Sequence, residues 1–107
     1  MKSPAVLLYT SDFLTGTILL SDEDVGKYIR LLCLQHQVYP EHIPESHMIF
    51  ICNSLDSAVA KKFIRDKQGN YYNERMQIEI EKRLSYSKSR SNNRKSGLKK
   101  EKHMKNI

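Results

Sequence analysis

The apolar residues of this chain stop recurring after Leu84, and this break limits the part that can fold into a core to residues 1–85. Residues 86–107 alternate serine, asparagine and basic residues, with few side chains suited to burial. Such a segment cannot offset the entropy of ordering by burying apolar surface. We therefore expect one small domain over residues 1–85. We expect a fraying helix and then a basic, low-complexity, largely disordered tail over residues 86–107.

The charges divide at nearly the same place. Residues 1–81 hold 8 Lys or Arg and 11 Asp or Glu, a balance of −3, whereas residues 82–107 hold 10 Lys or Arg and one Glu, a balance of +9. Clustered cations favour a polyanionic partner, because neutralised phosphates release condensed counterions. The charge therefore indicates a nucleic acid as partner, although a solubilising tail has the same composition.

The first strong helix signal begins at Ser21, which is followed by three acidic residues in the position of a first helical turn. Ser at the N-cap accepts a backbone hydrogen bond, and acids in the first turn oppose the helix dipole. Behind it, apolar residues recur at helical spacing. They predict a helix over residues 22–37 whose stripe contains Val25, Ile29, Leu32 and Cys33 and is widened by Tyr28 and Leu31.

Two prolines, Pro40 and Pro44, bracket a short segment in which residues 42–43 form either a brief strand or a loop. The next run, residues 45–52 (ESHMIFIC), fits two structures. Its apolar positions share a helical face, yet residues 49–51 (IFI) also suit a strand. Length does not decide between them.

A polar break at residues 53–56 then precedes a predicted third helix, with Ser54 or Asp56 as its N-cap. Val59 and Phe63 face inward in this helix, and two lysines face outward.

A hairpin is predicted next, because strand-favouring residues 62–65 and 71–73 flank a polar turn that contains Gly69–Asn70. Asn73 is then a candidate N-cap for a last helix. The stripe of that helix consists of Met76, Ile80 and Leu84. The order helix, short strand, helix, helix, hairpin, helix predicts an α+β, mostly α, winged helix-turn-helix fold. It has a three-helix core, a β-hairpin wing, a C-terminal helix and a basic tail.

Three stretches together, Phe13–Gln37, Phe63–Met76 and Glu79–Lys95, carry a resemblance to a known family. They resemble the N-terminal domain of phage replisome-organiser or replication-initiator proteins, and a related family of unknown function with a winged-helix fold. The matching motifs are GKYIRLL (Gly26–Leu32) and GNYYNERM (Gly69–Met76). The resemblance implies DNA binding in phage or prophage replication, in the cytoplasm of a bacterial host cell, with other replication proteins as partners. Helicase loading is not carried over.

In a winged helix the second helix of the helix-turn-helix and the wing face DNA, so polar residues there are candidate contacts. The tail cations are candidate contacts to phosphates without sequence preference. Duplex DNA is expected in preference to single strands. The candidate DNA-binding residues are Ser57, Lys61, Lys62, Lys67, Gln68, Asn70, Lys88, Arg90, Arg94, Lys95, Lys99 and Lys100.

Two rival functions remain open. One is a protein-interaction or dimerisation module in which the acidic surface and the Met76, Ile80 and Leu84 stripe pair with another chain, giving for example a homodimer. The other is RNA binding, because a basic tail does not choose between nucleic acids.

Other classes are disfavoured by the residues present. Cys33 and Cys52 lie in apolar stretches, which is typical of core residues in a reducing compartment and predicts no disulfide. The histidines lack the paired spacing of a structural zinc site, so no metal and no cofactor is expected. No P-loop or catalytic constellation is present, which predicts a protein that is not an enzyme. No apolar run approaches the ~20 residues of a membrane span.

Overall fold

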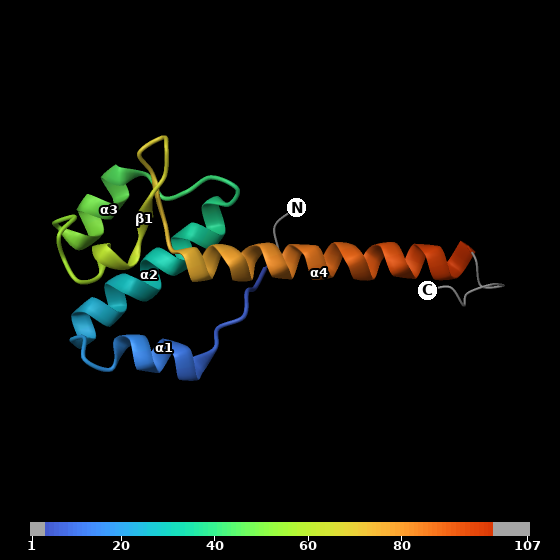
Figure 1. Ribbon diagram of the computed structural model, residues 1–107, viewed down its shortest axis with the longest axis horizontal. Helices are drawn as coiled ribbons and strands as arrows, with labels where there is room; N and C mark the ends of the chain where they lie inside the picture. Colours follow the sequence, from blue (N-terminus) through green and yellow to red (C-terminus); the bar gives the residue numbers. More distant parts are fainter. Residues whose placement is uncertain (1–3, 100–107) are drawn as a thin grey trace.

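The computed structural model describes residues 4–99, with side chains as far as residue 86, and shows a mostly helical α+β chain (Figure 1). The α+β class is the one that the sequence predicts. The elements in chain order are α1 (Thr10–Thr17), α2 (Asp22–Val38), α3 (Glu45–Cys52), the 3₁₀ turn η1 (Ala60–Lys62), β1 (Ile64–Arg65), β2 (Tyr71–Tyr72) and α4 (Glu74–Lys99).

The first helix, α1, is an element that the apolar pattern does not predict. Its sequence, TSDFLTGT, contains a glycine and three threonines, which have low helix propensity. Packing stabilises it instead. The ring of Phe13 stacks on Tyr28 of α2 with the two centroids 5.6 Å apart, and the buried Thr17 hydroxyl donates to the Phe13 carbonyl over 2.8 Å.

The long helix α2 begins at the predicted cap. Ser21 Oγ accepts a hydrogen bond from the backbone N–H of Asp24 over 3.1 Å, and the helix continues for one residue beyond the predicted end, to Val38. Pro40 follows two residues later, where the helix no longer needs its N–H. Both the predicted start and the predicted end of this helix are confirmed within a residue.

The buried face of α2 differs from the predicted stripe. Leu31 and Leu32 are buried as expected, but Ile29 and Cys33 are exposed, while the polar Gln35 and His36 are buried beside the two leucines. The prediction that Cys33 is a core residue is therefore wrong. The reason is that hydrogen bonds from Gln35 to the start of α4 turn this face of α2 inward, as described below. The second thiol, Cys52, is buried as predicted, and burial raises its pKa.

Residues 45–52 form a helix, α3, which settles the choice left open by the sequence. Pro44 supplies the extended residue before the helix, and Asn53 ends it in the left-handed conformation, with φ of 68°. The N–H of Asn53 donates to the Ile49 carbonyl over 2.7 Å, which satisfies one of the last carbonyls of the helix.

The predicted third helix is wrong in its extent, because only the 3₁₀ turn η1 forms there. Its N-cap is Val59, which has no side-chain acceptor, and not Ser54 or Asp56. Ser57 Oγ, two residues earlier, accepts from the N–H of Ala60, the first residue of the turn, over 3.2 Å. Phe63 is already extended, with φ of −119° and ψ of 147°, to begin the hairpin. This leaves room for a single turn, which tightens to i→i+3 bonding. Val59 and Phe63 are nonetheless buried, as the sequence predicts.

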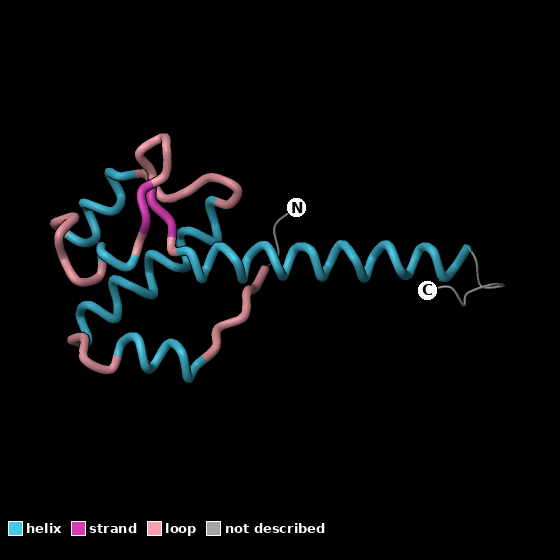
Figure 2. Tube along the Cα trace, viewed as in Figure 1, coloured by secondary structure: helices cyan, strands magenta, loops and turns pink. Residues whose placement is uncertain are grey.

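The sheet consists of the predicted hairpin and one residue from the segment between the prolines. β1 and β2 are antiparallel, with Ile64 opposite Tyr72 and Arg65 opposite Tyr71 (Figure 2). On the other side of β2, Ile43 exchanges two backbone hydrogen bonds with Tyr71, of 2.8 and 2.7 Å. The strand order is therefore Ile43, β2, β1, with β2 in the centre.

The last helix, α4, begins at the predicted cap and continues further than expected. Asn73 Oδ1 accepts from the N–H of Met76 over 2.9 Å. The helix then runs through residues 86–99, where we expected order to be lost, and projects beyond the rest of the chain (Figure 1). This stretch contains no proline, and each residue added to an existing helix forms one more hydrogen bond. Residues 100–107 lie outside the described part of the chain.

The core lies between α2, α3, the sheet and the first turns of α4. Its fully buried apolar side chains are Leu31, Ile43, Met48 and Val59, which come from four different segments, and the amide of Gln35 is buried with them. Met76 and Ile80 of α4 are also buried in it, and Leu84 packs against it. Within residues 4–99, none of the helices combines the length and the apolar character needed to cross a membrane.

Candidate nucleic-acid interface

The hairpin turn over residues 66–70 is held by one carboxylate. Asp66 Oδ1 accepts hydrogen bonds from the backbone N–H groups of Gln68 and Asn70, over 2.8 and 2.9 Å. The backbone adds a bond from the Asp66 N–H to the Asn70 carbonyl over 2.7 Å. Gly69 has a φ of +87°, a conformation that other residues adopt only with strain. The turn therefore has a fixed shape.

This turn presents polar and cationic side chains to solvent. Lys67 and Gln68 are exposed, and Asn70 is half-buried. Arg65, which precedes the turn, folds its guanidinium over Gly69: a Cβ at position 69 would lie 3.2 Å from Arg65 Nη2. The predicted residues Lys67 and Gln68 thus lie together at the tip, and Arg65 joins them there.

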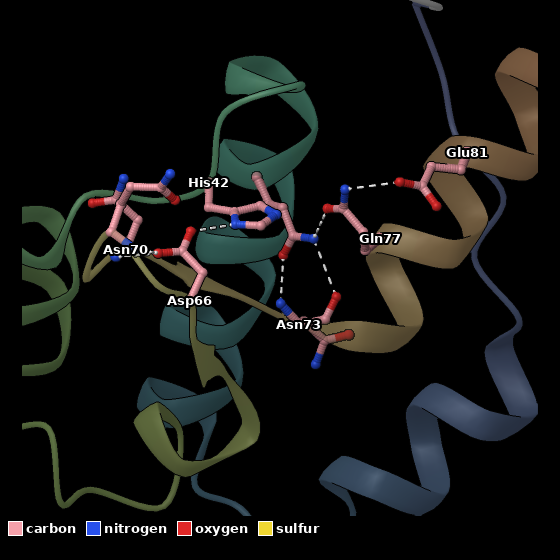
Figure 3. Close-up of polar contacts among 8 residues, drawn as sticks. His42, Asp66, Asn70, Asn73, Gln77 and Glu81 are labelled. Atoms are coloured by element: carbon pink, nitrogen blue, oxygen red, sulfur yellow. Dashed lines mark hydrogen bonds and ion pairs between the residues drawn. The ribbon is translucent and has the colours of Figure 1, made fainter.

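The carboxylate that holds the turn also contacts a histidine from another segment. Asp66 Oδ2 lies 2.5 Å from His42 Nδ1, and because a carboxylate only accepts, Nδ1 is the donor (Figure 3). The His42 ring stacks on Tyr72 with centroids 4.3 Å apart. The hydrogen bond from His42, followed by those from the turn amides, lowers the pKa of Asp66 below its ordinary value of 3.8.

The predicted contacts on the third helix are arranged differently from the expectation. Because η1 is a single turn, it does not present a row of side chains along a helix face. Ser57 Oγ accepts a hydrogen bond from the N–H of Ala60, at the start of η1. Lys62 is half-buried, and its Nζ lies 5.5 Å from the centre of the Tyr28 ring, a cation–π contact. Of these three, Lys61 alone is exposed.

A buried amide network sets the position of the hairpin relative to the helices. The Gln35 side chain pairs with the backbone of Asn73 in both directions: Oε1 accepts from the Asn73 N–H over 2.7 Å, and Nε2 donates to the Asn73 carbonyl over 3.1 Å. Asn73 Nδ2 in turn donates to the Lys62 carbonyl over 3.0 Å. The network continues through Gln77 to Glu81 on α4 (Figure 3). One residue, Asn73, thereby joins α2, η1 and α4 where the hairpin ends.

An open groove of about 570 Å³ lies between β1 and the first turns of α4. Its lining includes the exposed Ile64 and Ile78, with Lys62 and Arg75 at its cationic positions and Glu74 and Glu79 at its acidic ones. Arg75 forms an ion pair with Asp12 of α1. The mixed charge of this groove favours no particular ligand.

The projecting part of α4 carries most of the predicted tail cations. Its helical backbone includes Lys88, Arg90, Arg94, Lys95 and Lys99, and no acidic residue stands between residues 86 and 99. Lys100 lies outside the described residues. As far as the structure describes the chain, no three His, Cys, Asp or Glu side chains come together in a manner that suits a metal ion.

Comparison of the chain with protein-family models, with curated proteins and with solved structures finds no match.

The sequence analysis did not assign His42 or Asp66 to the interface. Asp66 has a detectable signal, because an Asp at the start of a Gly-containing turn commonly bonds to backbone amides further along. Arg65 directly precedes this turn, which marks it as a neighbour of the tip. His42 has no local signal, since it lies 24 residues before its partner.

Proposed function

We propose that this chain is a non-catalytic DNA-binding protein in which a winged-helix-type domain is followed by a basic helix. The single observation that carries the proposal is the position of the cations. Exposed Arg65 and Lys67 lie on a fixed hairpin tip, and five further cations follow on the projecting part of α4, which has no acidic residue from 86 to 99. A polyanion gains affinity from each phosphate that such cations neutralise.

The strand order supports the winged-helix interpretation. A helix, an edge residue, a second helix, a helical turn and a hairpin follow one another, and Ile43 pairs with the second strand of the hairpin. In a winged helix-turn-helix, η1 would then occupy the place of the recognition helix and residues 66–70 that of the wing tip. Fold alone does not establish function, so the charged surface is the stronger support.

The short η1 changes the expected kind of contact. Since Ser57 accepts from the backbone of Ala60 and Lys62 contacts Tyr28, few side chains remain there for base edges. We propose that phosphate contacts dominate and that any sequence preference comes from Lys61, Lys67, Gln68 and Asn70. A role in phage or prophage replication initiation rests on the family resemblance of the sequence.

The rival protein-interaction function loses one of its supports. Met76 and Ile80 are 8% and 2% exposed and belong to the core of this chain. These two side chains of the apolar stripe are therefore not available to contact another chain. The acidic surface of the domain still allows a protein partner, and RNA remains an alternative polyanion.

The proposal is tested by fluorescence anisotropy with a random-sequence duplex, a single strand and an RNA duplex at two salt concentrations. The parent chain is compared with a Lys67→Ala/Gln68→Ala variant, and with Ser46→Ala on α3 as the control. We expect duplex DNA to bind most tightly, the hairpin variant to bind severalfold more weakly, and the control to bind as the parent does. Absence of duplex binding, together with a dimer mass in solution, would favour the interaction module. Tighter binding to the RNA duplex would favour the RNA alternative.

Sequence preference is tested separately, by selecting sites from a random duplex pool with the parent and with a Lys61→Ala variant. A lost base contact is expected to cost about 1–3 kcal/mol at one position of the site. Identical selected motifs, or no motif from the parent, would leave Lys61 as a contact to phosphate only.

A further inference from the structure

The contact between His42 and Asp66 joins two parts of the chain that the backbone keeps separate. His42 precedes α3, whereas Asp66 begins the hairpin turn, and their side chains meet at 2.5 Å. The side chains are 22% and 14% exposed, so water competes little for this bond. Stacking on Tyr72 of β2 fixes the plane of the His42 ring and therefore the direction of its Nδ1–H.

Asp66 divides its two oxygens between two tasks. Oδ2 accepts from His42, while Oδ1 accepts from the backbone amides of Gln68 and Asn70. A carboxylate free to rotate about its χ angles would not hold both amides at once for long. The bond to His42 restrains that rotation, so the shape of the turn depends on a side chain outside the hairpin.

The shape of the turn determines where the cations of the tip lie. Lys67 lies between Asp66 and the first amide that it holds, Gln68 carries that amide, and the Arg65 guanidinium lies against Gly69. A turn that loses its restraint moves all three side chains relative to β1 and β2. Contacts held in advance cost less entropy on binding than contacts that must first be ordered.

We propose that His42 and Asp66 are positioning residues for DNA contact by the hairpin turn, acting through the 2.5 Å bond between them and the two backbone amides that Asp66 holds. The proposed role requires no direct contact between either side chain and DNA. The inference rests on the proposed function for its effect on binding, but its effect on the turn is independent of any ligand.

The experiment uses the full chain and two substitutions at one position. His42→Phe keeps a ring that stacks on Tyr72 and removes the donor, whereas His42→Asn places an N–H donor close to the position of Nδ1 and restores the bond. The control is His47→Phe, the same change at an exposed histidine of α3. Asp66→Ala removes the contact from the other side and serves if His42→Phe does not fold. Each variant is characterised by its melting temperature, by amide exchange at Gln68 and Asn70, and by anisotropy with the random-sequence duplex.

In His42→Phe, loss of the charge-assisted bond is expected to speed exchange of the two amides about tenfold and to weaken duplex binding about three- to tenfold. His42→Asn should return both values toward those of the parent, and His47→Phe should match the parent. Parental amide exchange in His42→Phe or Asp66→Ala would overturn the positioning role. Faster exchange with unchanged duplex affinity would overturn the link to DNA. A parent that binds no duplex, with exchange still dependent on His42, would refute the proposed function and the link to DNA while retaining the role in the turn.

Discussion

At the scale of single residues, Gln35 has the largest structural consequence, although periodicity places polar residues on the outside of a helix. Its side chain is fully buried and pairs with both backbone groups of Asn73, much as a neighbouring strand would. The two residues are separated by 38 positions, so no local pattern predicts the pairing. The caps at Ser21 and Asn73, by contrast, are local and were predictable from the sequence.

Gln35→Ala is expected to lower the free energy of unfolding by about 1–3 kcal/mol, because the buried N–H and carbonyl of Asn73 lose their partner. Arg30→Ala, at an exposed position of the same helix, is the control and should change stability by less than about 0.5 kcal/mol. Urea denaturation followed by circular dichroism measures both. Equal stability of the two variants would show that water replaces Gln35 without cost.

The lowered pKa of Asp66 predicts how the stability of the chain changes in acid. Its pKa is lowered in the folded state, mainly by the hydrogen bond from His42, so ionisation of Asp66 favours folding. This contribution is complete above the ordinary value of 3.8 and is lost as the pH falls below it through the lowered value. Asp66→Asn lacks the charge at every pH. We therefore expect the parent to melt at a higher temperature than Asp66→Asn at pH 7, and the difference to shrink steadily below pH 4. A difference that is constant from pH 7 to pH 2.5 would contradict the assignment.

At the scale of elements, neighbouring segments determined the secondary structure of two stretches that the local sequence pattern left open or predicted wrongly. Residues 45–52 suited a helix or a strand, and the extended Pro44 and left-handed Asn53 on either side fit a helix of two turns. Residues 56–63 have a helical pattern, yet Phe63 is needed in the hairpin and the helix is reduced to η1. The hairpin tip was predictable because its turn residues are local. Its connection to His42 was not, since it depends on tertiary packing.

Gly26 in α2 and Gly69 in the hairpin turn lead to opposite predictions for replacement by alanine. Gly69→Ala is expected to destabilise the chain by about 1 kcal/mol or more, because φ is +87° and the new Cβ would crowd Arg65. Gly26→Ala is expected to stabilise it by about 0.5–1 kcal/mol, because α2 is helical there and, apart from its chain neighbours and the nearby helix backbone, no atom lies within 4 Å of the new Cβ. Thermal melting of the two variants against the parent tests both signs, and a stabilising Gly69→Ala would refute the description of the turn.

At the scale of the whole molecule, the chain combines a domain of slightly negative charge with a strongly cationic extension. Residues 1–81 carry a balance of −3 and residues 82–107 a balance of +9. This division of charge was available from the sequence, and so was the order of elements from α2 to α4, although the third helix is reduced to η1 and α1 was not predicted. The continuation of α4 to Lys99 was not available, because apolar periodicity reports burial and this part of the helix projects away from the core (Figure 1).

The charge division predicts how duplex binding responds to salt. Replacing Lys88, Arg90, Arg94 and Lys95 with glutamine removes four cations from the projecting part of α4 and leaves the hairpin tip unchanged. If each of the four neutralises one phosphate, the slope of log K against log salt falls by up to about 3.6 in magnitude, at about 0.9 for each phosphate.

The matched control exchanges the same residues between Lys and Arg, which preserves every charge and alters the hydrogen-bonding geometry. This control should keep the parental slope. If some contacts depend on the guanidinium group, their loss would weaken binding at every salt concentration without changing the slope. Anisotropy titrations at four salt concentrations measure the slopes. A glutamine variant with the parental slope would mean that the extension does not contact phosphates, and that the hairpin tip and Lys61 supply the electrostatic part of the affinity.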